Sequence, residues 1–230
     1  MADIAQFTRP SLHDEILGAL RELIVSGDLR AGGWIAEPAL CRRLGISRTP
    51  LREALKVLAF DGWVELVPNR GAVVTRITAD EAGALFELLE GLEQFVGELA
   101  ASRASATDRR EIRELHDAMA AHFIDGDANA YFVVNQQIHH RLAQAAGNRE
   151  LLAMHENLSR KVMRARAMAN LITHRQEASY AEHAAILHAL EQRDGTQLGR
   201  LLRTHIHDAG EAVRDALASR TRPARKRGTR

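Results

Sequence analysis

The sequence has few of the features that stabilise small secreted proteins or anchor membrane proteins. It contains one cysteine among 230 residues, so no disulfide framework can form within one chain, and the expected compartment is a reducing cytoplasm. The sequence contains no run of about 18 apolar residues, so we expect no membrane-spanning helix. The first residues do not resemble a secretory signal. Aromatic residues make up only 4% of the chain. A core must therefore consist mainly of Leu, Ala, Ile and Val, which favours helices.

The charges are segregated along the chain, although the net charge is only +1. Residues 1–77 contain ten basic and nine acidic side chains, residues 78–219 contain fifteen and twenty-one, and residues 220–230 contain six basic and no acidic ones. A protein that binds nucleic acid needs positive charge only where the phosphates lie. The near-neutral total therefore leaves nucleic-acid binding open.

Residues 1–77 have the periodicity of three short helices followed by two strands. Apolar residues recur at helical spacing over 11–26, and further helices are expected at 37–44 and 48–61, each closed by a glycine. Residues 63–67 and 72–77 are rich in β-branched side chains on either side of a turn at 68–71, which predicts a hairpin. This order predicts a winged helix-turn-helix domain, whose helix at 48–61 would enter the major groove of DNA.

Residues 78–219 show helical periodicity and no strand pattern. Six helices are expected, at 79–104, 108–124, 128–146, 149–171, 175–193 and 196–218. The short connections between them predict antiparallel packing in a bundle. The predicted fold class is therefore mainly α, with an N-terminal winged helix-turn-helix, an all-α antiparallel helical bundle at 78–219, and a disordered basic tail at 220–230.

Basic and hydroxyl side chains gather where the second and third helices would meet DNA. An arginine can bind a guanine edge with two hydrogen bonds, and hydroxyl groups can donate to phosphate oxygens. The dipole and free N–H groups at the start of the helix add to this attraction. The candidate DNA-binding residues are Arg42, Arg43, Ser47, Arg48, Thr49, Arg52 and Lys56, with Arg70 and Gly71 in the turn of the wing.

This segment resembles the GntR family of transcription regulators. The resemblance rests on the stretch GISRTPLREALKVLAFDGWVELVPNRGAVV and extends over about 60 residues. Ala31 stands where the family usually has proline, and Pro38 replaces a polar or basic residue that is common before the second helix. The resemblance implies a sequence-specific DNA-binding transcription regulator; a repressor is the expected role, and an activator is the alternative. One winged domain makes few base contacts, so we expect a homodimer on double-stranded operator DNA with two related half-sites.

Ten of the eleven histidines lie between residues 116 and 207. Asn135 and His139 are four residues apart and share one face of a helix, but scattered histidines in a helical domain are more often core or surface residues than ligands. The strings VNQQIHHRLAQAAGN, YAEHAAILHAL and LLRTHI resemble the FCD effector domain of the FadR-like branch of the family. That resemblance implies a divalent metal, Zn²⁺ or Ni²⁺, held by Asn135, His139, His183 and His205.

Two departures from the family pattern concern this site. Asn135 stands where aspartate is commoner, which removes one negative charge and predicts weaker metal binding. Leu89 stands where an arginine is frequent, so the protein must use another cation for an acidic effector or bind a different class of ligand. Arg160 and Arg164 are the candidates for contacting the effector, which the resemblance implies is an organic acid, although both could simply be exposed helix residues.

Two other classes of protein compete with a regulator. A three-histidine metal site could activate water, so a metal-dependent hydrolase fused to a DNA-binding module is the alternative. The sequence contains no Gly-rich phosphate loop, Ser-centred elbow or paired-cysteine motif that would support an enzyme. A DNA-packaging protein would use the basic tail but would not explain an acidic, histidine-rich second domain. We therefore interpret the chain as a regulator and not as an enzyme.

Overall fold

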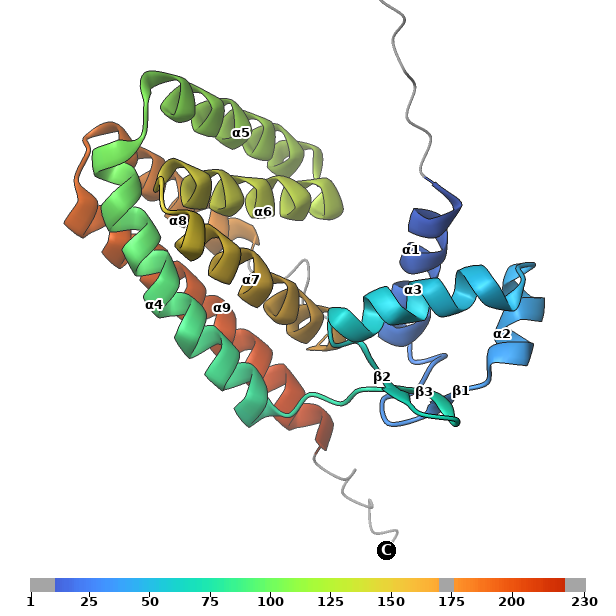
Figure 1. Cartoon of the computed structure of the whole chain (residues 1–230). Helices are drawn as coiled ribbons and strands as arrows, with labels where there is room; N and C mark the ends of the chain where they lie inside the picture. Colours follow the sequence, from blue (N-terminus) through green and yellow to red (C-terminus); the bar gives the residue numbers. More distant parts are fainter. Residues whose placement is uncertain (1–10, 170–175, 222–230) are drawn as a thin grey trace, which may run out of the picture. The chain divides into compact units, whose positions relative to one another are not determined.

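The computed structural model describes residues 11–169 and 176–221, which belong to two compact units, Met1–Arg76 and Ile77–Arg230. Figure 1 shows the elements in chain order. The predicted fold class is confirmed. The first unit is a helix-turn-helix with a small antiparallel sheet, and the second is a bundle of helices. None of the described helices is long and apolar enough to cross a lipid bilayer.

The first unit consists of three helices and a three-stranded sheet. Its elements are α1 (Leu12–Val25), β1 (Trp34–Ile35), α2 (Glu37–Leu44), α3 (Arg48–Phe60), β2 (Val64–Val67) and β3 (Gly71–Val74). The strand order is β1-β3-β2, with Trp34 opposite Val73 and Val67 opposite Gly71. The sequence predicted only the β2–β3 hairpin. Strand β1 escaped prediction because two residues are too few to show an alternating pattern.

A small apolar core orients α3 within this unit. The fully buried side chains of Leu20 on α1 and of Leu51 and Leu58 on α3 belong to this core. Leu51 and Leu58 are seven positions apart, which is about two helical turns, so they share one face of α3. The opposite face of α3 is therefore left to solvent.

The second unit contains only helices among its described residues. They are α4 (Ala79–Arg103), α5 (Ala106–Asp125), α6 (Ala128–Ala145), α7 (Arg149–Ala169), α8 (Gln176–Glu191) and α9 (Gly195–Thr221). Helix α9 continues three residues beyond its predicted end, and the rest of the predicted basic tail lies outside the described residues. The main core packs around Ile138, Leu142, Ile186 and Leu190.

Helices α4 and α9 lie side by side along the bundle, as the green and red ribbons of Figure 1 show. Glycine permits their close approach, because a Cβ atom on Gly97 would lie 2.7 Å from the Cα atom of Gly199. A second cluster around Phe86 on α4 and Ile206 on α9 extends this packing. Helix α9 is thus held close to α4, which is the helix that follows the wing directly in the chain.

A short segment joins the two units. Thr75 belongs to the first unit, where its hydroxyl group donates to the carbonyl oxygen of Gly62 at 2.7 Å. Thr78 caps α4, since its side chain accepts from the Glu81 backbone N–H while the Glu81 carboxylate accepts from the Thr78 backbone N–H. Ile77 packs against the cluster shared by α4 and α9. Both ends of the segment are therefore anchored.

Candidate DNA-binding surface and metal centre

The first turn of α3 carries exposed basic and hydroxyl side chains. Arg48, Thr49 and Arg52 face solvent, while Leu51 is buried on the opposite face. Ser47 is at the N-cap position, but its side chain makes no capping hydrogen bond. The N–H groups of this turn lack helical partners and the helix dipole is positive here, so this end of the helix attracts phosphate.

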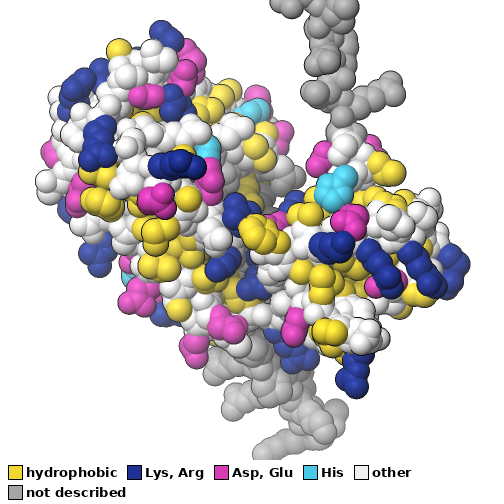
Figure 2. All heavy atoms as spheres, viewed as in Figure 1, with side chains coloured by type: hydrophobic (Ala, Val, Ile, Leu, Met, Phe, Trp, Pro, Cys, Tyr) yellow, Lys and Arg dark blue, Asp and Glu magenta, His cyan; other side chains and the backbone are white. Residues whose placement is uncertain are grey.

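A groove runs between the start of α2, α3 and the wing. Five of the nine candidate DNA-binding residues line it, namely Arg48, Arg52, Lys56, Arg70 and Gly71. Gly71 has a φ of 101°, which strongly favours glycine, and it begins β3 directly after the exposed turn. Figure 2 shows dark blue basic side chains gathered over the α2 and α3 end of this unit. The remaining four candidates are exposed outside the groove lining: Arg42, Arg43, Ser47 and Thr49.

Acidic neighbours already hold some of these basic side chains. The Nε atom of Arg52 donates to the Glu37 carboxylate on α2 at 3.0 Å, which orients the guanidinium across the groove. Lys56 pairs with Glu53 at 2.8 Å, and both of these side chains are more than half exposed. Exposed ion pairs contribute little to stability. Phosphate can therefore replace Glu53 as the partner of Lys56 at low cost.

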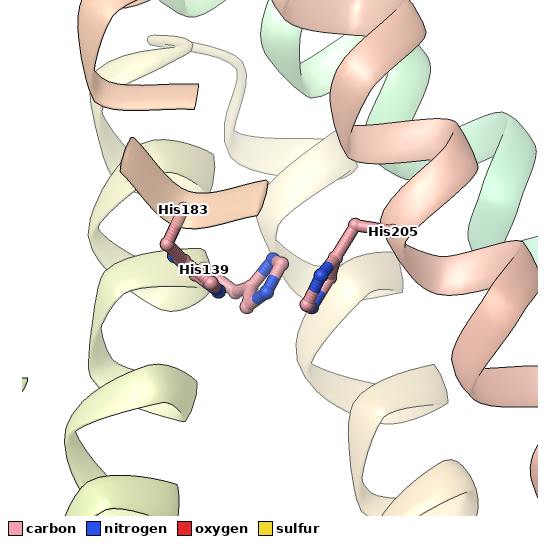
Figure 3. A group of neighbouring side chains, drawn as sticks. All are labelled: His139, His183 and His205. Carbon is pink, nitrogen blue, oxygen red and sulfur yellow. The ribbon is translucent and has the colours of Figure 1, made fainter. Parts of the chain in front are cut away.

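Three histidines from three helices converge inside the bundle. His139 lies on α6, His183 on α8 and His205 on α9, and Figure 3 shows their rings turned toward one another. One ring nitrogen from each lies within 4.8 Å of those of the other two. All three side chains are buried. The structure therefore brings the three histidines of the predicted metal site together in the core, and Asn135, one turn before His139 on α6, is also buried.

Several polar atoms of this cluster are buried without a hydrogen-bond partner among the described residues. They are Asn135 Oδ1, His139 Nε2, His205 Nε2 and both ring nitrogens of His183. A buried polar atom without a partner costs about 1–3 kcal/mol, and a bound ion is one common explanation for a group of them. Three imidazoles and an amide oxygen fit a divalent metal of the zinc or nickel type. Such an ion would supply a Lewis-acid site for an anionic ligand.

Carboxylates contact the outer nitrogens of two of these histidines. The Glu93 Oε1 atom on α4 lies 2.8 Å from His139 Nδ1 and 3.0 Å from His155 Nε2. The Glu182 Oε2 atom lies 2.6 Å from His205 Nδ1. The carboxylate hydrogen-bonded to His205 Nδ1 fixes the tautomer of that ring and leaves its Nε2 to bind a metal. His139 Nδ1 lies close to Glu93, but this contact does not have the geometry of a hydrogen bond. Glu93, His155 and Glu182 were not predicted from the sequence to lie at this site.

His116 on α5 borders the same cluster. Its Nδ1–H donates to the carbonyl oxygen of Ile112 at 2.8 Å, because a carbonyl group can only accept. Its Nε2 atom is buried without a partner among the described residues, and its ring centroid lies 5.4 Å from that of His183. The structure therefore places His116 in the core beside a predicted ligand.

Burial shifts the pKa values of the cluster. Desolvation, together with repulsion from the neighbouring imidazoles, lowers the pKa of His183 well below its ordinary value. Desolvation likewise lowers the pKa of His205 to about 4, although the hydrogen bond with Glu182 opposes the shift. For Glu93, burial alone would raise the pKa, but contacts with His139 and His155 outweigh burial and hold it well below the usual range. At neutral pH His183 and His205 are therefore uncharged, which is the form that binds metal.

We expect the metal-free protein to lose stability as the pH falls from 6.5 to about 4. In this window the unfolded chain protonates His205 at its ordinary pKa of 6.5, whereas the folded chain resists protonation down to about 4. The stabilisation is thus fully present above 6.5 and is lost as the pH falls, by at most roughly 3 kcal/mol. His183 and His116 act in the same direction, and the raised pKa of His155 acts in the opposite one.

Urea unfolding of chelator-treated protein at pH 7, 6 and 5 measures this effect. The variant His205→Gln lacks the titrating group, so its stability should depend less on pH. Stability that is constant or that rises toward pH 5 would contradict the prediction.

A cavity of ≈ 10 Å³ lies beside the cluster, with room for about one water molecule. His139, Glu93, Arg166 and Leu89 are among its lining residues. The side chain of Leu89 is buried, so this part of the lining is apolar. Neither of the predicted effector contacts lines this cavity: Arg160 is exposed and Arg164 is half-buried on other faces of α7. Arg166 does line the cavity, but it was not predicted from the sequence, because its spacing on the helix does not distinguish it from Arg160 and Arg164.

Both units match known families. Residues 12–74 match the bacterial regulatory proteins of the gntR family, and residues 84–208 match the FCD domain. The chain is 31% identical over 186 residues to the Nta operon transcriptional regulator of Aminobacter aminovorans, covering 80% of this chain and 86% of that protein. It is 27% identical over 208 residues to the transcriptional repressor RspR of Escherichia coli, covering 90% of each.

A solved structure supports the fold. The Escherichia coli protein McbR/YncC superposes with a TM-score of 0.69 at 19% identity, covering 90% of this chain and 99% of that one. The sequence relatives are transcription regulators and not enzymes, so the chain is a DNA-binding transcription regulator. It belongs to the GntR family, in the branch whose winged helix-turn-helix is followed by an FCD domain.

Proposed function

We propose that this regulator represses transcription as a homodimer, and that a small organic acid bound at a divalent metal in the helical bundle controls its affinity for the operator. The observation that carries the proposal is the convergence of His139, His183 and His205 with buried nitrogen atoms that no described residue satisfies. A metal at that point would join α6, α8 and α9. Effector binding could then bias how these helices pack.

Control of DNA binding requires that the effector favours one arrangement of the protein over another. A ligand that binds two arrangements equally well shifts neither. Because the metal ligands lie on three helices, a ligand that changes the coordination of the metal would move α6, α8 and α9 relative to one another. RspR is described as a repressor, which supports the same role here. The single cysteine is consistent with action in a reducing cytoplasm.

Exposed apolar side chains on the bundle support pairing of two chains. Leu88 and Phe95, one heptad apart on α4, are 55% and 45% exposed. Val133 and Ile124 are exposed on α6 and α5. One winged unit makes few base contacts, and two units that bind one duplex together gain affinity through effective concentration.

We expect the purified protein to be a dimer with a mass close to twice 25.5 kDa. Light scattering at micromolar concentration measures the mass, and selection of binding sites from random double-stranded DNA identifies the operator. Two related half-sites should emerge from that selection. The double variant Leu88→Asp/Phe95→Asp tests the α4 surface, with Met154→Asp on α7 as a matched exposed control. A monomer that binds the selected operator with undiminished affinity would refute the dimer.

A further inference from the structure

We propose that His116 on α5 positions the metal ligand His183, by accepting a hydrogen bond from the ring nitrogen of His183 that does not bind the metal. The inference rests on the proposed function, since it assumes that a divalent metal occupies the histidine cluster. His116 does not contact the metal itself. It joins a fourth helix, α5, to the three helices that carry the histidine ligands.

The ring of His183 differs from those of the other two histidine ligands, because no carboxylate among the described residues contacts it. Glu182 lies 2.6 Å from Nδ1 of His205, and Glu93 lies 2.8 Å from Nδ1 of His139. Both ring nitrogens of His183 are buried without a hydrogen-bond partner among the described residues. Besides desolvation, which lowers the pKa of His183, the groups that shift this pKa are all imidazoles. A neutral imidazole that binds a metal through one nitrogen carries its proton on the other, so this buried N–H needs an acceptor.

His116 offers that acceptor. Its Nδ1–H donates to the carbonyl oxygen of Ile112 at 2.8 Å. Desolvation lowers the pKa of His116, and the nearby carbonyl groups of Ile112 and His183 only partly oppose this shift, so the ring is uncharged at neutral pH. The lone pair of the neutral ring is therefore on Nε2, which is buried without a partner among the described residues. A carbonyl group cannot satisfy this lone pair, because it has no proton to donate, whereas an imidazole N–H can.

The rings of His116 and His183 lie at the separation that such a hydrogen bond requires. Their centroids are 5.4 Å apart, and their planes are inclined by 56°. In an N–H···N hydrogen bond of about 2.9 Å, with each nitrogen about 1 Å from the centre of its ring, the two centres lie about 5 Å apart. A small rotation of either ring therefore brings the unpaired donor to the unpaired acceptor once a metal fixes the tautomer of His183.

This hydrogen bond gives α5 a part in the metal centre. It extends from His183 through His116 to the backbone of Ile112, which is fully buried in the main core. Helix α5 packs against α6, which carries His139, and against α8, which carries His183. Loss of the acceptor therefore loosens the orientation of a metal ligand without opening the core.

The test is the zinc affinity of full-length variants, measured by competition with a chromogenic chelator. His116→Leu removes the acceptor but fills the core, and it should lower the affinity by about 10–100-fold, as for other groups that orient a metal ligand. His116→Gln places an amide oxygen close to the position of Nε2. It should keep the affinity within about threefold of the unchanged protein, since a neutral hydrogen bond is retained. His122→Leu makes the same exchange elsewhere on α5 and should leave zinc affinity unchanged.

Urea unfolding of the chelator-treated variants separates positioning from a structural role. Without metal, His116→Leu should be at least as stable as the unchanged protein, because the exchange removes a buried nitrogen that has no partner among the described residues. A residue that only filled the core would instead change the stability of the metal-free protein and leave zinc affinity as it was.

Three results would overturn the inference while the unchanged protein holds zinc. They are normal zinc affinity in His116→Leu, an affinity in His116→Gln as low as in His116→Leu, and a loss of affinity that is matched by a loss of stability in the metal-free protein. Unchanged protein that holds no zinc after supplementation would contradict the proposed metal centre itself, and the role of His116 would be refuted with it.

Discussion

His183→Ala and His139→Ala should each lower zinc affinity by more than about 100-fold and abolish the response to the effector. Changes to groups that only orient a metal ligand cost 10–100-fold in affinity, so loss of a ligand should cost more. Both imidazoles are buried with ring nitrogens that no described residue satisfies. Competition with a chromogenic chelator gives the affinity, and mass spectrometry of desalted protein gives the zinc content. Both variants should still bind operator DNA in at least one state.

Two variants serve as controls for this result. His188 lies on the same helix as His183 but is exposed, so His188→Ala should leave zinc affinity unchanged. Asn135→Asp adds the negative charge that the site lacks and should increase zinc affinity. Two results together would show that these histidines are structural residues. The unchanged protein would hold no metal after zinc supplementation, and the double variant His139→Ala/His183→Ala would respond normally to the effector.

Arg48→Ala and Arg52→Ala should each weaken operator binding by about 5–150-fold, which corresponds to the roughly 1–3 kcal/mol of a good arginine–guanine contact. Both side chains line the groove at the start of α3, and Arg52 is already oriented by Glu37. Fluorescence anisotropy with the selected operator and a scrambled duplex, at one fixed salt concentration, separates specific from general binding. The bundle should remain folded and should bind zinc normally.

Arg110→Ala provides the comparison for a change of charge alone. Arg110 is an exposed arginine on α5 that pairs with Glu114, and it should not affect operator binding. Unchanged operator affinity in both Arg48→Ala and Arg52→Ala would contradict the assignment of α3 to the major groove.

The helices could be predicted because their apolar spacing and their terminal residues agree. Gly45 and Gly126 end α2 and α5 in the left-handed conformation, as glycines after helical patterns indicate. The three histidine ligands were predicted from a resemblance, because spacing alone cannot show that side chains 22 to 66 residues apart in the sequence lie together. The structure adds their convergence, which depends on how α6, α8 and α9 pack.

A signal for Glu93 was nevertheless present in the sequence. Glu93 occupies the same helical stripe as Leu89, Val96 and Ala100, all of which are buried. A carboxylate among apolar residues at that spacing predicts a buried charge with a cationic or hydrogen-bonding partner. The partner could not be identified from the sequence, because His139 and His155 come from two other helices.

The anchored segment between Thr75 and Thr78 determines how far a winged unit can reach. Three peptide steps span at most about 10 Å when fully extended. In the proposed dimer, so short a tether leaves each winged unit little conformational freedom. Once one winged unit has bound DNA, the second therefore has a high effective concentration only for half-sites within a narrow range of distances from the first. The permitted distance between operator half-sites would then be encoded in the pairing of the bundles. Lengthening the tether with flexible residues would broaden the range of operators while lowering the affinity for each.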